Sequence, residues 1–141
     1  MEKYYWVQGR RKSAGIKTTC ALVPVADLVE NFKQIIIGPR LWEKALNGEY
    51  IHDFYGKKLS LSPHFIEDLT NYSIQEAAQH VHQPFFIIHG EQDTAVPFHY
   101  SYDLDASLAS SEKNLQIFAE EDHSFSEQIY SAVGKWFKQY L

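Results

Sequence analysis

The sequence has 141 residues, of which 45% are hydrophobic and 15% aromatic, a composition that indicates a folded domain and excludes a disordered chain. Its formal net charge of −5 argues against a nucleic-acid partner, whose phosphates require a basic surface. No apolar run is long enough to span a bilayer and the N-terminus lacks a secretory signal, so we expect a cytoplasmic protein with no membrane partner.

The first element that the pattern predicts is a buried strand over residues 16–23. β-branched and apolar residues dominate this stretch, which ends at Pro24. It contains the only cysteine, Cys20, so no disulfide can form within the chain, and we interpret Cys20 as a small buried side chain. Residues 3–12 are aromatic and then basic, and they fit either the end of a helix or a short strand.

The next part of the chain is long for a connection between two strands. Apolar spacing and capping residues predict a hairpin over residues 49–61 and helices over residues 25–35, 39–47, 62–69 and 73–80. Long inserts between strands commonly act as lids over a site. We therefore predict a helical and hairpin cap insert over residues 28–80, within one C-terminal domain fragment that spans residues 1–141.

The second half of the chain alternates strands with helices. The apolar run at residues 85–89 predicts a central strand, and a helix over residues 98–109 separates it from another strand over residues 114–118. A final helix has apolar residues at helical spacing, from Ile129 to Tyr140. This alternation predicts an α/β fold with about three parallel strands and flanking helices.

Two polar residues follow neighbouring strands of this predicted sheet. Asp93 lies just past the strand that ends in His89-Gly90, and His123 lies in the loop after the next strand. Functional groups gather at the carboxyl ends of parallel strands, so we expect the two side chains to meet there. A carboxylate that fixes the tautomer of a histidine is the acid and base part of a Ser-His-Asp triad.

These motifs resemble the α/β-hydrolase superfamily. Residues 89–97 match the pattern His-Gly-x-x-Asp-x-x-Val-Pro, residues 122–125 match Asp-His-x-Phe, and residues 24–27 resemble the end of the sixth strand in that family. The resemblance extends from about residue 16 to residue 141 and is closest to small esterases and acyl-peptidase-like hydrolases. It implies a partial α/β-hydrolase fold, with Asp93 as the triad acid and His123 as the base.

The nucleophile of this family lies in a Gly-x-Ser-x-Gly elbow before the strand at residues 16–23, and no such pattern occurs in the sequence. Ser13 lacks the preceding glycine, and no buried strand leads into it. We therefore expect the chain to correspond to the C-terminal half of the fold. Without a nucleophile or an oxyanion hole it should be inactive as a triad enzyme when alone.

Some other residues carry alternative interpretations. Asp27 also follows a strand end and is a second candidate acid, although a helix cap is the other role for an aspartate there. His80 and His82 have a spacing found in metal sites, but no third ligand accompanies them. We therefore expect no metal and no cofactor. His89 is expected to pack or to form hydrogen bonds at the end of its strand.

Two classes of function follow from the sequence. In the first, the chain belongs to a serine hydrolase of carboxylic esters or related acyl compounds, and a missing N-terminal half supplies the serine. In the second, it is a non-catalytic remnant that acts as a dimeric or binding module. The strand at residues 16–23 would have a bare edge in either case, so we expect a homodimer through this edge or an N-terminal half paired with it. Peptidase and dehalogenase chemistry share the fold and stay open.

Overall fold

The computed structural model describes residues 15–54 and 56–141. The segment at residues 3–12 and Ser13 therefore lie outside the described residues. The chain divides into two compact units, of which one combines the chain up to Ala26 with Ile74–Leu141 and the other is Asp27–Ser73. Within the described ranges, no helix has both the length and the apolar character that crossing a membrane requires.

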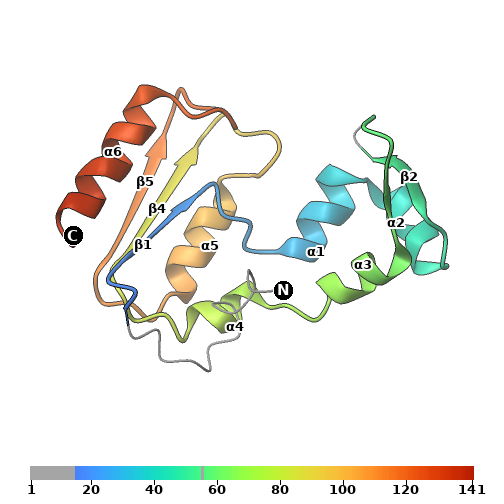
Figure 1. Ribbon diagram of the computed structural model, residues 1–141, viewed down its shortest axis with the longest axis horizontal. Coiled ribbons are helices and arrows are strands. Elements are labelled where there is room, and N and C mark those ends of the chain that lie inside the picture. Colours follow the sequence, from blue (N-terminus) through green and yellow to red (C-terminus); the bar gives the residue numbers. More distant parts are fainter. Residues whose placement is uncertain (1–14, 55) are drawn as a thin grey trace. The chain divides into compact units, whose positions relative to one another are not determined.

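The first unit is built on a three-stranded parallel sheet (Figure 1). Its strands are β1 (Thr19–Leu22), β4 (Phe85–Gly90) and β5 (Lys113–Phe118), in the order β1-β4-β5. The register pairs Thr19 with Phe85, and Phe85 with Lys113. All three strands therefore end at the same edge of the sheet, which confirms the predicted partial α/β-hydrolase fold.

The central strand β4 supplies side chains to two cores. Phe85 and Ile87 pack into one core with Tyr100 and Leu104 of helix α5 (His99–Ser107). Phe86 and Ile88 alternate with them and pack into a second core with helix α6 (Glu127–Lys138). Because successive side chains of a strand point to opposite faces, the two helices cover opposite faces of the sheet. All six residues of β4 are buried, as expected for a strand covered on both faces.

Helix α6 is fixed by hydrogen bonds near its C-terminal end. The indole Nε1 of Trp136 donates to Thr18 Oγ1 at 2.7 Å, and the Thr18 hydroxyl donates to the Pro84 carbonyl at 2.9 Å. Farther along, the Tyr140 hydroxyl donates to the Glu112 carboxylate. That hydrogen bond is the main cause that raises the pKa of Tyr140 to about 12. These contacts join α6 to the segments that lead into all three strands.

The second unit, Asp27–Ser73, has a core of its own, and the short helix α4 (Ile74–Ala78) follows it. Its elements are short: α1 (Leu28–Asn31), a π-helix (Phe32–Ile36), α2 (Pro39–Leu46), the hairpin strands β2 (Ile51–Phe54) and β3 (Leu59–Leu61), and α3 (Pro63–Leu69). Its buried core residues are Trp42, Ala45, Ile51, Ile66 and Leu69. The unit therefore has the helix and hairpin composition that the sequence predicts for the insert.

One helix of this unit differs from the prediction. The expected helix at residues 25–35 starts later, after the N-cap Asp27, and its second half is a π-helix in which the Ile37 N–H donates to the Phe32 carbonyl at 3.0 Å. This stretch ends in three consecutive isoleucines. β-branched side chains lower the α-helix propensity of this stretch, and the chain adopts the rarer π turn there.

Candidate active site

The turn after β4 presents a buried carboxylate. Asp93 follows three residues after Gly90, and its side chain has no exposed surface. Its Oδ1 accepts hydrogen bonds from the backbone N–H groups of Ala95 at 2.9 Å and Val96 at 2.8 Å. A buried carboxylate is costly unless its oxygens are hydrogen-bonded. These two donors satisfy Oδ1 and fix the direction in which Oδ2 points.

The loop after β5 brings His123 to that second oxygen. Nδ1 of His123 lies 2.8 Å from Asp93 Oδ2, which confirms the contact expected between the two predicted residues. An ionised carboxylate can only accept, so Nδ1 carries the proton and Nε2 of the neutral ring has a free lone pair. The His123 side chain is 55% exposed. The arrangement therefore combines a fixed acid with an accessible base.

The two loops approach each other closely at Gly90. A Cβ at this position would lie 2.2 Å from the Glu121 carbonyl oxygen and 2.9 Å from that of Asp122. Hydrogen bonds join the same segments, from Gln92 N to Glu121 O at 2.9 Å and from Gln92 Nε2 to Ala119 O at 3.1 Å. Only a glycine permits this approach, so Gly90 is a site residue whose role the sequence motif did not indicate.

Short-range hydrogen bonds shape the acidic loop that carries His123. The Ser124 N–H donates to Asp122 Oδ1 at 2.6 Å, and the Ser126 hydroxyl donates to the Glu121 carboxylate. The hydrogen bonds from Ser124 are the main cause that lowers the pKa of Asp122. Ser126 also caps α6 by accepting from Gln128 N. The loop therefore has internal support on both sides of His123.

His89 lies completely buried behind the pair. Its Nδ1 is 2.6 Å from Ser101 Oγ, and its Nε2 is 2.8 Å from the Val96 carbonyl oxygen. Nε2 is also 3.6 Å from Asp93 Oδ2. Burial is the main cause that lowers the pKa of His89. This confirms a hydrogen-bonded histidine at the strand end and shows which groups it joins.

The other candidate residues have different places. Asp27 accepts from Glu30 N at 2.8 Å and caps α1, so the carboxylate that pairs with His123 is Asp93 and not Asp27. No group of three or more histidine, cysteine, aspartate or glutamate side chains in residues 15–54 and 56–141 could hold a metal, and His80 and His82 belong to no such group. Cys20 is only partly buried, and its burial raises its pKa to about 11.

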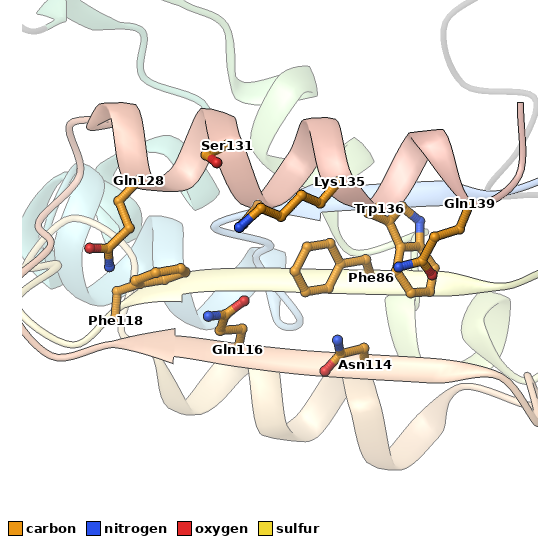
Figure 2. Close-up of a pocket in the computed structure, with 10 residues that line it drawn as sticks. Phe86, Asn114, Gln116, Phe118, Gln128, Ser131, Lys135, Trp136 and Gln139 are labelled. Carbon is orange, nitrogen blue, oxygen red and sulfur yellow. The ribbon is translucent and has the colours of Figure 1, made fainter.

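A hollow of about 380 Å³ lies between α6 and the face of β4 and β5 (Figure 2). Most of its lining is polar and includes Asn114, Gln116, Gln128, Ser131, Lys135 and Gln139, together with the aromatic rings of Phe86, Phe118 and Trp136. None of the lining residues comes from the loops that carry Asp93 and His123. The candidate active site therefore rests on the acid and base geometry and not on this hollow.

A buried carboxylate that contacts an exposed histidine, on the loops after two parallel strands, matches the placement of the acid and base in the α/β-hydrolase pattern. The sequence comparison agrees, because residues 16–141 match the prolyl oligopeptidase family. The chain belongs to this family, and the resemblance to the α/β-hydrolase superfamily is confirmed. No curated protein matches the sequence significantly.

Solved α/β-hydrolase structures share the fold at low sequence identity. Est1E from Butyrivibrio proteoclasticus superimposes with a TM-score of 0.64 at 17% identity, covering 89% of this chain and 51% of Est1E. The Paleococcus ferrophilus monoacylglycerol lipase has a TM-score of 0.65 at 14% identity, and the match covers 89% of this chain and 60% of the lipase. The Pyrococcus horikoshii acylaminoacyl peptidase has a TM-score of 0.61 at 19% identity, and the match covers 89% of this chain and 20% of the peptidase. The chain thus spans less than two thirds of these proteins.

Proposed function

We propose that this chain provides the acid and base of a serine hydrolase that acts on carboxylic esters or related acyl compounds. The observation that carries the proposal is the 2.8 Å contact between His123 Nδ1 and Asp93 Oδ2, with the acid buried and the base exposed. The names of two similar structures, a monoacylglycerol lipase and an acylaminoacyl peptidase, support acyl transfer as the reaction class.

In this mechanism His123 moves one proton in two steps. Its Nε2 takes the proton of a serine hydroxyl as the serine oxygen attacks the acyl carbonyl carbon, and it then gives that proton to the leaving alcohol or amine. Asp93 stabilises the imidazolium that forms between the two steps. The sequence has no Gly-x-Ser-x-Gly pattern, so the serine and the oxyanion hole must come from polypeptide outside these 141 residues.

The outer edge of β1 is where that polypeptide would pair. Among the described residues, β1 pairs with β4 on one side and with no strand on its other side. Unpaired strand edges are templates for strand addition. An N-terminal half that carries the serine would extend the sheet there, and a second copy of the chain would compete for the same edge. The second occupant corresponds to the alternative function, a dimeric or binding module without catalysis.

The insert is proposed as a cap that influences substrate choice. The carboxyl end of β1 lies at the sheet edge that also carries the loops of Asp93 and His123. The chain enters the insert at Asp27, shortly after this end of β1. Leu46, Tyr50 and Leu59 in this unit are 55–57% exposed, and exposed apolar side chains suit contact with an acyl group. A photoreactive fatty-acyl ester should therefore label Asp27–Ser73, and labelling confined to other residues would contradict this role.

Two measurements on the purified chain test the acid and base assignment. The first is labelling with a fluorophosphonate and hydrolysis of p-nitrophenyl butyrate, with His123→Ala as the comparison. We expect no labelled serine. A labelled serine together with turnover that requires His123 would show that the nucleophile lies within these 141 residues.

The second measurement is the NMR signal of the ring protons. A hydrogen bond from a histidine to a buried carboxylate shifts its N–H proton far downfield, so His123 Nδ1–H should give such a signal. Asp93→Ala should abolish the signal, whereas Asp27→Ala, which removes a helix-capping carboxylate, should leave it unchanged. If the signal is absent from the unmodified chain, the pair does not form and the proposed function is wrong.

A further inference from the structure

His89 and Ser101 form a buried pair that the triad mechanism does not use. His89 is the fifth residue of β4, Ser101 lies on α5, and both side chains have no exposed surface. The imidazole lies between Ser101 Oγ at 2.6 Å and the Val96 carbonyl at 2.8 Å. A strand, a helix and the Asp93 turn therefore meet at one ring.

The partners of the ring determine where its proton lies. The Val96 carbonyl can only accept a hydrogen bond, so Nε2 of His89 must carry the hydrogen. A buried imidazole is neutral, which leaves Nδ1 as an acceptor for the Ser101 hydroxyl. This tautomer, with the proton on Nε2, is the opposite of the one that Asp93 imposes on His123.

The direction of the Nε2–H bond matters because His89 is close to the acid. Nε2 lies 3.6 Å from Asp93 Oδ2, the oxygen that accepts from His123. A small rotation of the ring would direct this N–H at Oδ2 and make it compete with His123. Donation to the Val96 carbonyl prevents that competition. It also holds Val96, whose own N–H donates to Asp93 Oδ1 at 2.8 Å.

We propose that His89 is a positioning residue for the acid: with its tautomer fixed by the Val96 carbonyl and its ring held by Ser101, it holds the Val96 peptide, and thereby the Asp93 turn, and leaves Oδ2 to His123. This inference rests on the proposed function for its catalytic meaning. The structural part can be tested without any activity, because Ala95 and Val96 report on the turn through their amides.

The test is amide hydrogen exchange, with the histidine tautomers followed by ¹⁵N NMR. Ser101→Ala removes the hydroxyl that donates to Nδ1, so the His89 ring loses one of the groups that hold it. The Ala95 and Val96 amides should then exchange about tenfold faster, the effect expected from losing one buried hydrogen bond. The Val96 carbonyl still requires the proton on Nε2, so the tautomer should not change. Ser107→Ala is the matched control, because Ser107 is on the same helix and donates only to the Asp103 carbonyl of its own helix.

Substitution of the histidine separates positioning from packing. His89→Gln keeps one amide donor for Val96 and one acceptor for Ser101, so it should retain slow exchange at Ala95 and Val96. His89→Leu fills the space without either group, and exchange there should accelerate.

Unchanged exchange in both Ser101→Ala and His89→Leu would overturn the inference, as would a His89 that carries its proton on Nδ1. A different measurement would contradict the proposed function, namely the absence of the His123 Nδ1–H signal from the unmodified chain.

Discussion

The two oxygens of the Asp93 carboxylate have separate tasks. Oδ1 accepts from the amides of Ala95 and Val96, and Oδ2 accepts from His123. A substitution that keeps one oxygen and replaces the other with an amide group therefore separates the support of the turn from the control of the histidine.

Asp93→Asn should leave the turn folded and reverse the tautomer of His123. The remaining carbonyl oxygen can accept from the turn amides, but the NH₂ group facing His123 can only donate, so Nδ1 must become the acceptor. The proton then lies on Nε2, where the base lone pair is needed. The ¹⁵N shifts of His123 measure the change. Asp27→Asn should not alter them, and a His123 that keeps its Nδ1 proton in Asp93→Asn would contradict the prediction.

Gly90→Ala should destabilise the protein and separate the two loops. The new Cβ would lie 2.2 Å from a backbone carbonyl oxygen, and relieving such overpacking costs about 1–3 kcal/mol of unfolding free energy. Gly134→Ala is the control, because nothing lies within 4 Å of its Cβ position on α6 and a helical alanine should stabilise by roughly 0.5–1 kcal/mol. Urea unfolding measures both. Equal stability of the two variants would contradict the close approach.

His89 should make stability depend on pH below neutrality. Burial is the main cause that lowers the pKa of His89 from the ordinary 6.5, and the nearby His123 and His99 lower it further. The hydrogen bond to Val96 and the charge of Asp93 raise the pKa, but these effects are smaller than that of burial. As the pH falls below 6.5 the unfolded chain binds a proton that the folded chain does not. The unfolding free energy therefore decreases, by at most about 1.4 kcal/mol per pH unit from this residue, until the folded-state pKa is reached.

Urea unfolding between about pH 5 and pH 8, on the unmodified chain and His89→Gln, measures this contribution. The glutamine does not titrate, so its curve should decline less steeply on acidification. If the unfolding free energies of the two proteins decrease equally with falling pH, His89 does not cause the loss of stability.

At the scale of elements, apolar patterning predicted most of the sheet and its helices. The strands at residues 85–89 and 114–118 and the flanking helices are confirmed within a few residues, because burial on both faces leaves a continuous apolar run. Asp93 and His123 could be predicted because both follow strands of the same sheet. The partners of His89 could not, because Ser101 and the Val96 carbonyl reach it through tertiary packing that no spacing encodes.

Backbone geometry was the other part that the sequence did not reveal. Val23 has a φ of 45° where the chain leaves β1, a conformation that a β-branched residue rarely adopts. Its N–H donates to the Ile88 carbonyl at 2.8 Å, so pairing with β4 helps to hold it there. The π-helix at Phe32–Ile36 was not predicted either, since apolar spacing predicts a helix but does not distinguish a regular α turn from the wider π turn.

Thr18→Val should show how much the hydrogen bond between Thr18 and Trp136 of α6 contributes to the free energy of unfolding. The methyl group that replaces the hydroxyl cannot accept from the Trp136 indole N–H, which is buried with its ring. An unsatisfied buried donor costs about 1–3 kcal/mol of unfolding free energy. Thr19→Val is the matched control, since the Thr19 hydroxyl has no partner among the described residues. Thermal or urea unfolding should separate the two variants, and similar losses would mean that the bond contributes nothing.

For the molecule as a whole, the outer edge of β1 is the feature that bears on assembly. Thr19 N–H donates to Pro84 O and Val23 N–H to Ile88 O, so in a regular parallel ladder Ala21 also donates toward β4. The N–H groups of Cys20 and Leu22 then point to the outer edge. Half-buried apolar side chains on both faces of β1 make this edge suited to receiving another strand.

Cys20→Pro should weaken any association through this edge without removing a bond to β4. Proline lacks the outward N–H and is tolerated on edge strands, and Cys20→Ala controls for the loss of the thiol. We expect the unmodified chain and Cys20→Ala to sediment as dimers in the micromolar range, and Cys20→Pro to shift toward the monomer. An unmodified chain that sediments as a monomer would contradict pairing with a second copy. The edge would then be open to the serine-bearing half of the fold, because both occupants need the same row of N–H and carbonyl groups.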